Sequence, residues 1–278
     1  MSAGAMAELR RRFGADEPLL QQYAMWLWNA VRGDLGASPS QGQPVSALLG
    51  NALPNTLLLM GLALPSSILF GVLLGAWQGV IAGTRSDRAT SALTLVMYSV
   101  PEFVLGLGLL LLFATGLRWL PASGVTSDDY VYLSDIGRAV DRVRHLVLPW
   151  LALTIVGTGI FARYQRAAMR DSMDEPFVRT ARAKGLPETE VRRHALRASL
   201  LPVITMAGLM FPALLGGAVL VEKVFNWPGM GMLTYNAITG RDYWLLSGAL
   251  IVASAMTAAG TLLADIARTL ADPRTAKA

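Results

Sequence analysis

Five long stretches without charge constrain the fold of this chain more than any other feature. Residues 35–84 contain no charged side chain, and residues 89–117 contain a single one, Glu102. Three further stretches, at 145–162, 198–221 and 243–264, are also free of Asp, Glu, Lys and Arg. A helix needs roughly 20 apolar residues to span the hydrocarbon core of a bilayer. We therefore expect five membrane-spanning helices, near residues 55–83, 90–119, 145–168, 199–221 and 243–265.

The composition favours an all-α membrane protein. Hydrophobic residues make up 53% of the chain and charged residues only 15%, whereas about a quarter of a typical soluble domain is charged. Helices satisfy their own backbone hydrogen bonds in lipid, and the apolar stretches lack the alternation of barrel strands. The expected fold is a polytopic bundle of membrane helices.

Basic residues are distributed unevenly between the two sides of this expected bundle. Nine of the 24 Lys and Arg residues lie between Arg163 and Arg197, and the 84–90 loop and the C-terminal tail fall on the same side. Within residues 53–278, that side carries 14 basic residues and the opposite side six. Loops rich in Lys and Arg stay in the cytoplasm, so the 163–197 loop and the C-terminus are expected there. The net charge of +5 thus reflects membrane topology, and no nucleic-acid partner is expected.

Motifs of common enzyme chemistry are absent from the sequence. No Gly-Lys dipeptide occurs, so there is no Walker A loop, and no Gly-x-Ser-x-Gly elbow is present. The chain contains no cysteine, and His145 and His194 have no partner at a metal-binding spacing, so both are interpreted as polar interface residues. We expect no catalytic residue, no cofactor and no metal. Energy for uphill transport would come from a separate ATPase subunit or from an ion gradient.

The basic loop begins with three arginines at helical spacing. Arg163, Arg166 and Arg170 share one face where the third expected span leaves the membrane. Cationic side chains in this position commonly reach the lipid headgroups while their apolar stems stay in the membrane. The three are interpreted as headgroup anchors.

A short helix with a glycine stop is expected next. Asp174 can cap it, Pro176 suits its first turn, and Gly185 can supply a left-handed stop. A second helical run follows and is expected to end at Pro202. Within the short helix, the apolar residues Phe177 and Ala181 are expected to share one face, with Val178 beside them. The cations Arg179, Arg182 and Lys184 are expected to point elsewhere. The spacing alone suits either a helix that docks in a partner's groove or an ordinary amphipathic surface helix.

Two runs in the basic loop carry a family resemblance. They read Phe-Val-Arg-Thr-Ala-Arg-Ala-Lys-Gly-Leu at 177–186 and Arg-His-Ala-Leu-Arg-Ala-Ser-Leu-Leu-Pro-Val-Ile-Thr at 193–205. Both resemble ABC-transporter permeases of the dipeptide/oligopeptide/nickel family. Other segments resemble the same family in the expected order: Trp-Leu-Pro-Ala-Ser-Gly (119–124), His-Leu-Val-Leu-Pro (145–149), Val-Phe-Asn-Trp-Pro-Gly-Met-Gly (224–231), Arg-Asp-Tyr (241–243) and Asp-Pro-Arg (272–274). The resemblance implies the fold of a type I ABC importer permease.

In that family the glycine-centred loop is a coupling helix, which seats in a cleft of the ATP-binding subunit. The resemblance places the coupling loop at about 170–198, with Arg179, Thr180, Ala181 and Gly185 at the Glu-Ala-Ala and Gly positions of the permease motif. Pro187 stands where a Ser cap is expected for the second helix. The residues expected to contact the ATPase are Phe177, Arg179, Thr180, Ala181, Lys184 and Gly185.

The implied function is that of the membrane-spanning subunit of an ATP-driven importer. Peptides are the expected cargo, with nickel or another small solute as the alternative. The implied partners are a second permease forming a heterodimer, two ATP-binding subunits and an extracytoplasmic substrate-binding protein in a bacterial inner membrane. A stand-alone secondary carrier is the competing class, but it would favour inverted repeats and several buried charges.

Two features of the apolar stretches have their own interpretations. Gly71, Gly75, Gly79 and Gly83 recur every four residues, which predicts close approach of another helix. Glu102 is an intramembrane carboxylate and therefore a candidate for the translocation path, where it could contact a substrate amine. The same glutamate also fits a capping box that begins at Ser99 and restarts a helix broken at Pro101.

Residues 1–52 are expected to form an external segment that precedes the permease domain at 53–278. Within it, residues 18–31 have Leu, Tyr and Val on one face and two tryptophans nearby, which predicts a helix in the membrane interface. Five spans and a cytoplasmic C-terminus leave the N-terminus outside. No apolar run in residues 1–52 would carry it across, and Arg10, Arg11 and Arg12 oppose export. We therefore expect a sixth helix, the family's first, to be encoded upstream of Met1.

Overall fold

The structure is a computed structural model that describes residues 18–215 and 218–271. In these residues the regular elements are helices, accompanied by one isolated β-bridge between Ala37 and Pro44. The expected all-α class is confirmed. Arg10, Arg11, Arg12 and the Asp-Pro-Arg motif at 272–274 lie outside the described residues. The elements are α2 (Leu19–Val31), α3 (Val45–Val80), α4 (Arg85–Ser99), α5 (Glu102–Leu109), η1 (Leu110–Gly116), η2 (Tyr130–Tyr132), α6 (Asp135–Asp174), α7 (Pro176–Ala183), α8 (Glu188–Leu215), α9 (Val219–Val224), α10 (Met230–Thr239) and α11 (Tyr243–Ala271).

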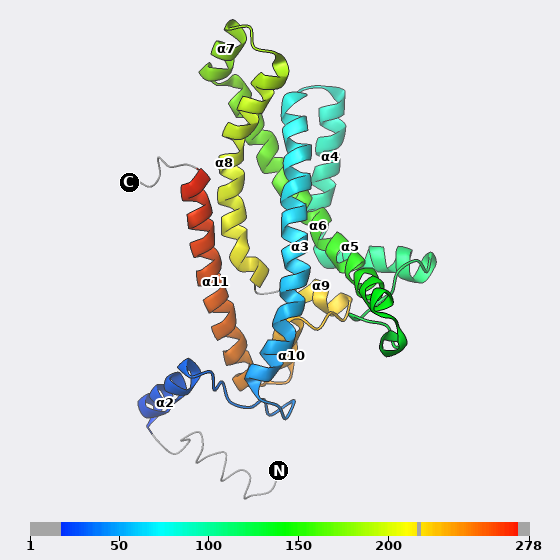
Figure 1. The fold of residues 1–278 in the computed structure, drawn as a ribbon, viewed down its shortest axis with the longest axis vertical. Coiled ribbons are helices and arrows are strands. Elements are labelled where there is room, and N and C mark those ends of the chain that lie inside the picture. Colours follow the sequence, from blue (N-terminus) through cyan, green and yellow to red (C-terminus); the bar gives the residue numbers. More distant parts are fainter. Residues whose placement is uncertain (1–17, 216–217, 272–278) are drawn as a thin grey trace, which may run out of the picture.

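The long helices extend along the longest axis of the molecule, with α7 at one end and α2 near the other (Figure 1). Helix α3 packs along α6, α4 packs along α6 on its other side, and α8 packs against α11 and α6. The turn between α3 and α4 lies at the same end as α7, whereas α9 and α10 lie toward the end that carries α2 (Figure 1). The two ends of the bundle are therefore built from different segments.

Three of the described helices are long and apolar enough to cross a membrane, namely Val45–Val80, Asp135–Asp174 and Tyr243–Leu262. They match the expected spans near 55–83, 145–168 and 243–265, although the first two helices begin about ten residues earlier than expected. The expected span at 199–221 lies on α8, which is described to Leu215, and Val219–Val224 is a separate helix.

The expected span at 90–119 is not one straight helix, because the chain bends sharply at Pro101. The segments Arg85–Ser99 and Glu102–Gly116 meet at 98°. Val100 takes an extended conformation (φ −78°, ψ 124°), as the residue before a proline prefers, and Pro101 has no N–H to continue the helical ladder. The second limb then changes from α-helical to π-helical geometry at Leu110. This segment forms either a broken span or a re-entrant loop.

Three glycines of α3 allow α6 to approach at backbone distance. A Cβ added at Gly71 would collide with Phe161, and one added at Gly75 would collide with the carbonyl oxygen of Ala162. A Cβ at Gly79 would lie 2.7 Å from the Cβ of Met169. The predicted small-residue ridge is thus confirmed for these three positions, which we call the glycine seam.

The fourth glycine of the expected ridge does not belong to the seam. Gly83 lies beyond the end of α3, with φ +87° and no atom near its missing Cβ. It occupies the turn to α4, where its N–H donates to Asp87 (2.9 Å). Its role is therefore conformational, because a left-handed backbone favours glycine.

The glycine seam generates a prediction about stability. We expect Gly75→Ala to destabilise the fold by about 1–3 kcal/mol, because the added methyl group meets a rigid carbonyl in a packed interface. Thermal unfolding of the purified chain in detergent measures the loss. Gly61→Ala is the matched control, since Gly61 is on the same helix and a Cβ there meets nothing within 4 Å. Equal melting temperatures for the two variants would contradict the seam.

Candidate functional site

The end of the bundle formed by α7 carries most of the residues singled out by the sequence. Helix α6 ends at Asp174, and Glu175 occupies the N-cap of α7 with Pro176 in the first turn. The expected Asp174 cap is wrong, because Pro176 drives the preceding residue out of helical geometry (Glu175 φ −67°, ψ 149°). One residue therefore redirects the chain from the long helix into the short one.

The C-terminal end of α7 forms a complete glycine stop. Gly185 has φ +75°, its N–H donates to the carbonyl of Arg182 (2.9 Å), and the N–H of Leu186 donates to the carbonyl of Ala181 (3.2 Å). This pair of bonds is the Schellman arrangement, which satisfies carbonyls left free at a helix end. The expected left-handed Gly185 is confirmed.

One face of α7 is anchored to the bundle. Val178 is fully buried and packs in a cluster with Met169 of α6 and Val191 and Ala195 of α8. Ala181 lies against the same cluster. Phe177 is 41% exposed, so the face that it shares with Ala181 at i, i+4 spacing is only partly packed against the bundle. Val178 supplies the anchor, and the larger aromatic ring is left at the surface.

The outward surface of α7 combines this aromatic ring with cations. Arg179, Thr180 and Lys184 are exposed, and the Thr180 hydroxyl donates back to the carbonyl of Pro176 (3.0 Å). One side of α7 is thus packed against the bundle, and its other side presents an unpaired aromatic ring with positive charges. This is the composition of a docking surface. We call Phe177, Arg179, Thr180, Ala181, Lys184 and Gly185 the α7 site.

An ion pair braces the turn that follows α7. The guanidinium of Arg182 donates to Glu188 at the start of α8 (2.9 Å). This hydrogen bond holds the pKa of Glu188 below its usual range. The side chains are solvent-exposed, so the pair orients the turn and contributes little to stability.

The second helical segment is longer than the sequence suggested. Helix α8 begins at Glu188 and continues through Pro202 to Leu215, so the expected end at Pro202 is wrong. Proline is tolerated within membrane helices when neighbouring groups satisfy the freed backbone. At its start, the carbonyl of Pro187 accepts from the N–H groups of Glu190 and Val191 (2.9 and 3.1 Å). The helix therefore begins directly after Pro187, although proline replaces the Ser cap of the family.

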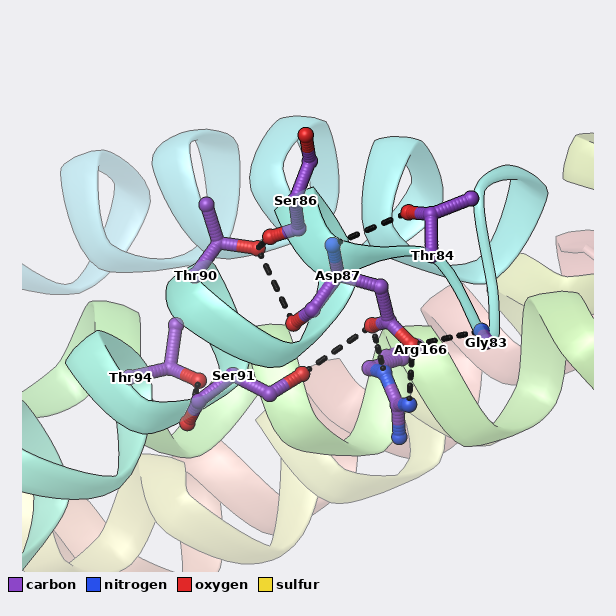
Figure 2. Close-up of polar contacts among 8 residues, drawn as sticks. All are labelled: Gly83, Thr84, Ser86, Asp87, Thr90, Ser91, Thr94 and Arg166. Atoms are coloured by element: carbon purple, nitrogen blue, oxygen red, sulfur yellow. Dashed lines mark hydrogen bonds and ion pairs between the residues drawn. The ribbon is translucent and has the colours of Figure 1, made fainter.

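A buried ion pair joins α4 to α6 just before α7. Both oxygens of Asp87 accept from Arg166, each at 2.8 Å, and Asp87 is only 2% exposed. Asp87 also accepts from the Gly83 N–H and from the Ser91 hydroxyl (3.1 Å), as Figure 2 shows. The interpretation of Arg166 as a headgroup anchor is wrong, since its charge is neutralised inside the protein.

Sequence reasoning missed Asp87, although a local signal was present. Thr84 and Asp87 have the spacing of a capping box, and the Thr84 hydroxyl accepts from the Asp87 N–H (3.1 Å; Figure 2). That signal predicts a helix start and an acidic first turn. The capping pattern does not predict the ion pair with Arg166, which lies 79 residues away, because that contact depends on how α4 packs along α6.

Arg163 has a different environment, although it lies one helical turn from Arg166. Its guanidinium carbon lies 5.1 Å from the ring centroid of Tyr98. Among the described residues, Arg163 has no hydrogen bond or ion pair. Arg170 is exposed further along α6. The three arginines thus do not act as one set of anchors.

Glu102 is the first residue of α5, immediately after the bend. The N-cap is Pro101 and carries no side-chain cap hydrogen bond, so the expected capping box from Ser99 is wrong. The Glu102 side chain is partly buried and has no hydrogen-bond or salt-bridge partner within the described ranges. Glu102 therefore does not cap a helix from Ser99, and its place in the translocation path remains a prediction.

The opposite end of the bundle contains a second buried acid that sequence reasoning did not single out. Glu222 is fully buried and accepts from the Thr56 hydroxyl (2.9 Å) and the Met232 N–H (2.8 Å). A Cβ at Gly229 or Gly231 would meet its carboxylate. The Gly-x-Gly of the 224–231 segment therefore wraps this glutamate and fixes the loop on α3.

Asp242 holds the segment before α3 in a similar way. One oxygen accepts from the hydroxyls of Ser38 and Ser40, the latter at 2.7 Å, and the other accepts from the Leu245 N–H (3.0 Å). Although burial opposes ionisation, these hydrogen bonds hold the pKa of Asp242 below its usual range. The N-terminal segment is thus tied to the start of α11.

The sequence and fold have relatives among known proteins. The family described as "Binding-protein-dependent transport system inner membrane component" matches residues 67–277. A putative peptide permease protein of Brucella ovis is 38% identical over 276 residues, covering 99% of this chain and 85% of the relative. The oligopeptide transport system permease protein AppB of Bacillus subtilis is 36% identical, covering 95% of this chain and 82% of the relative.

Solved structures share the fold at lower identity. The MetNI methionine ABC transporter, in an inward-facing conformation, superposes with a TM-score of 0.62 at 17% identity and covers 81% of this chain and 96% of its own. An amino acid ABC transporter with histidines gives a TM-score of 0.52 at 17% identity, covering 82% and 94%. The fold is therefore that of ABC importer permeases. By its sequence, the chain belongs to the family of binding-protein-dependent transport system inner-membrane components.

Proposed function

We propose that this chain is the membrane-spanning permease subunit of an ATP-driven ABC importer for peptides. The observation that carries the proposal is the α7 site, a short helix clamped by Val178 and stopped at Gly185, which projects Phe177 from one end of the bundle. The relatives above are named as peptide permeases, which favours peptides over nickel or another small solute. ATP hydrolysis would take place in separate subunits, since the sequence has no Walker A loop.

The assembly follows from this role. Two ATP-binding subunits would dock at the α7 end, a substrate-binding protein would dock at the opposite end, and a second permease would complete the path as a heterodimer. The positive charge of the 163–197 loop supports a cytoplasmic α7 end in a bacterial inner membrane. A stand-alone carrier would have no use for an exposed docking helix of this kind.

The mechanism links α7 to the membrane helices through α6. Helix α7 joins α6 at a single residue, Glu175, so a displacement of α7 by an ATPase moves the end of α6. The Asp87–Arg166 pair ties that part of α6 to α4, and α4 leads to the bend at Pro101. ATP-driven closure of the ATPases would thus switch the bundle between two packings that open to opposite sides.

Helix α2 fits a position in the membrane interface beside this bundle. Leu19, Leu20 and Val31 are largely exposed, as are the rings of Tyr23 and Trp28, and residues 18–31 carry no charge. Aromatic rings of this kind gather at headgroup level. We therefore place residues 1–52 outside the cell, with α2 lying on the outer surface of the membrane.

Phe177 should contribute to docking and not to folding. We expect Phe177→Ala to lower the transporter's ATPase activity and the recovery of ATP-binding subunits with the permease, because an exposed aromatic anchor is lost. Its melting temperature should stay near that of the unaltered chain. Val178→Ala is the contrast, since removing a fully buried side chain should cost about 2 kcal/mol of stability. Loss of stability in both variants, or normal ATPase recovery with Phe177→Ala, would contradict the docking role.

Gly185 should be required for coupling. Valine at this left-handed position adds about 1–2 kcal/mol of backbone strain and misdirects the end of α7. We expect Gly185→Val to reduce transport and substrate-stimulated ATPase activity without loss of membrane insertion. Gly33→Val imposes the same strain at φ +84° next to α2, far from α7. If Gly185→Val and Gly33→Val transport equally well, the α7 site does not couple ATP hydrolysis to transport.

Glu102 is proposed to face the translocation path, where its charge meets the amino group of the cargo. Glu102→Gln keeps the size of the side chain and removes the charge. We expect uptake to saturate at a substrate concentration several-fold higher, with unchanged amounts of protein in the membrane, and Glu102→Asp should retain most of the wild-type behaviour. Unchanged uptake by Glu102→Gln would remove this residue from the path.

A further inference from the structure

A cavity of about 430 Å³ opens between α4, α6 and α8. Tyr98 of α4, Arg163 and Tyr164 of α6, and Met206 and Met210 of α8 contribute to its walls. We call it the Arg163 pocket. It differs from the α7 site, and it has the size of a small-molecule site.

The charge in this pocket lacks a counterion. Arg163 contacts the face of Tyr98 (5.1 Å to the centroid) and, in the part of the chain that the structure describes, has no carboxylate partner. One turn along α6, Arg166 is neutralised by both oxygens of Asp87. Arg163 is exposed, so its charge is accessible to an external anion, whereas that of Arg166 is already paired within the protein.

The walls of the pocket define the chemistry of that anion. A guanidinium presents parallel N–H donors that match the two oxygens of a carboxylate. Tyr98 and Tyr164 offer aromatic surface beside it, and the methionines provide an adaptable apolar wall that accepts side chains of different shapes. A strong fixed charge beside a permissive apolar surface suits a ligand with a constant carboxylate and variable side chains.

We propose that the Arg163 pocket binds the C-terminal carboxylate of a peptide during its passage through the transporter. The proposal rests on the proposed peptide-import function. Peptides of different sequence share their charged termini, so a path that reads one terminus can serve many cargoes. Tyr98 lies three residues before the bend at Pro101, so binding in the pocket would take place next to the bend between α4 and α5.

A chemical test can use the absence of cysteine from this chain. Ala167→Cys places a single thiol at the wall of the pocket, in the complete transporter with its ATP-binding and substrate-binding subunits. Methanethiosulfonate reagents that carry either a sulfonate or a trimethylammonium group should react with it at different rates. We expect the anionic reagent to be favoured by at least about threefold, because Arg163 attracts it. The preference should disappear in Ala167→Cys/Arg163→Gln and persist in the control Ala167→Cys/Arg170→Gln. The same preference with and without Arg163 would overturn the proposal.

Protection by ligand identifies the anion. During turnover, a peptide with a free C-terminus should slow the labelling of Ala167→Cys, whereas the same peptide as a C-terminal amide should not. Equal protection by both peptides, or protection that depends only on anionic lipid in the vesicles and not on peptide, would overturn the proposal, the latter in favour of a lipid phosphate. If the transporter imports no peptide at all while the anion preference of the pocket persists, the proposed function fails and the anion site stands.

Discussion

Close contact between α3 and α6 is the constraint on which the rest of the structure depends. The glycine seam lets the backbones of the two helices meet without side chains between them, so the position of α6 along α3 is defined within a turn. In lipid, where burial of apolar surface gives no advantage between helices, this packing supplies the association. Helix α6 then carries the arginine pair, the Arg163 pocket and, at its end, α7. A shift at the seam would displace all three.

Two arginines on α6 illustrate how packing assigns different roles to the same residue type. Arg166 faces α4, where Asp87 accepts two hydrogen bonds from it, and the pair locks α4 to α6. Arg163 is three residues away and faces an open cavity with aromatic walls. A paired arginine holds helices together, whereas an unpaired one attracts a ligand. Their juxtaposition places a rigid connection beside a site that can respond to cargo.

The two ends of the bundle are stabilised in different ways. At the α7 end, apolar contacts of Val178 and an exposed ion pair leave a short helix projecting outward. At the other end, buried Glu222 and Asp242 accept several hydrogen bonds each and tie the loops before α3 and after α9 to the helices. Buried carboxylates with full sets of donors make rigid loops. A rigid surface at one end and a projecting helix at the other are consistent with a subunit that binds different partners at its two ends.

The sequence by itself determined the membrane class, the glycine stop of α7 and three glycines of the seam, because each depends on local chemistry. Apolar length sets a span, Pro176 and Gly185 set a helix start and stop, and glycines at every fourth position lie on one face of a helix. The direction of Asp87, Glu222 and Arg163 was decided only by the tertiary structure. The partners of Asp87 and Glu222 lie far away in the chain, and Arg163 has no ion pair among the residues that the structure describes, so no local pattern reveals which charge is buried, which is paired and which is left free. The bend at Pro101 was determined in part by each. The proline predicts a break in the helix, but the angle of 98° depends on how α5 packs against α6 and α9.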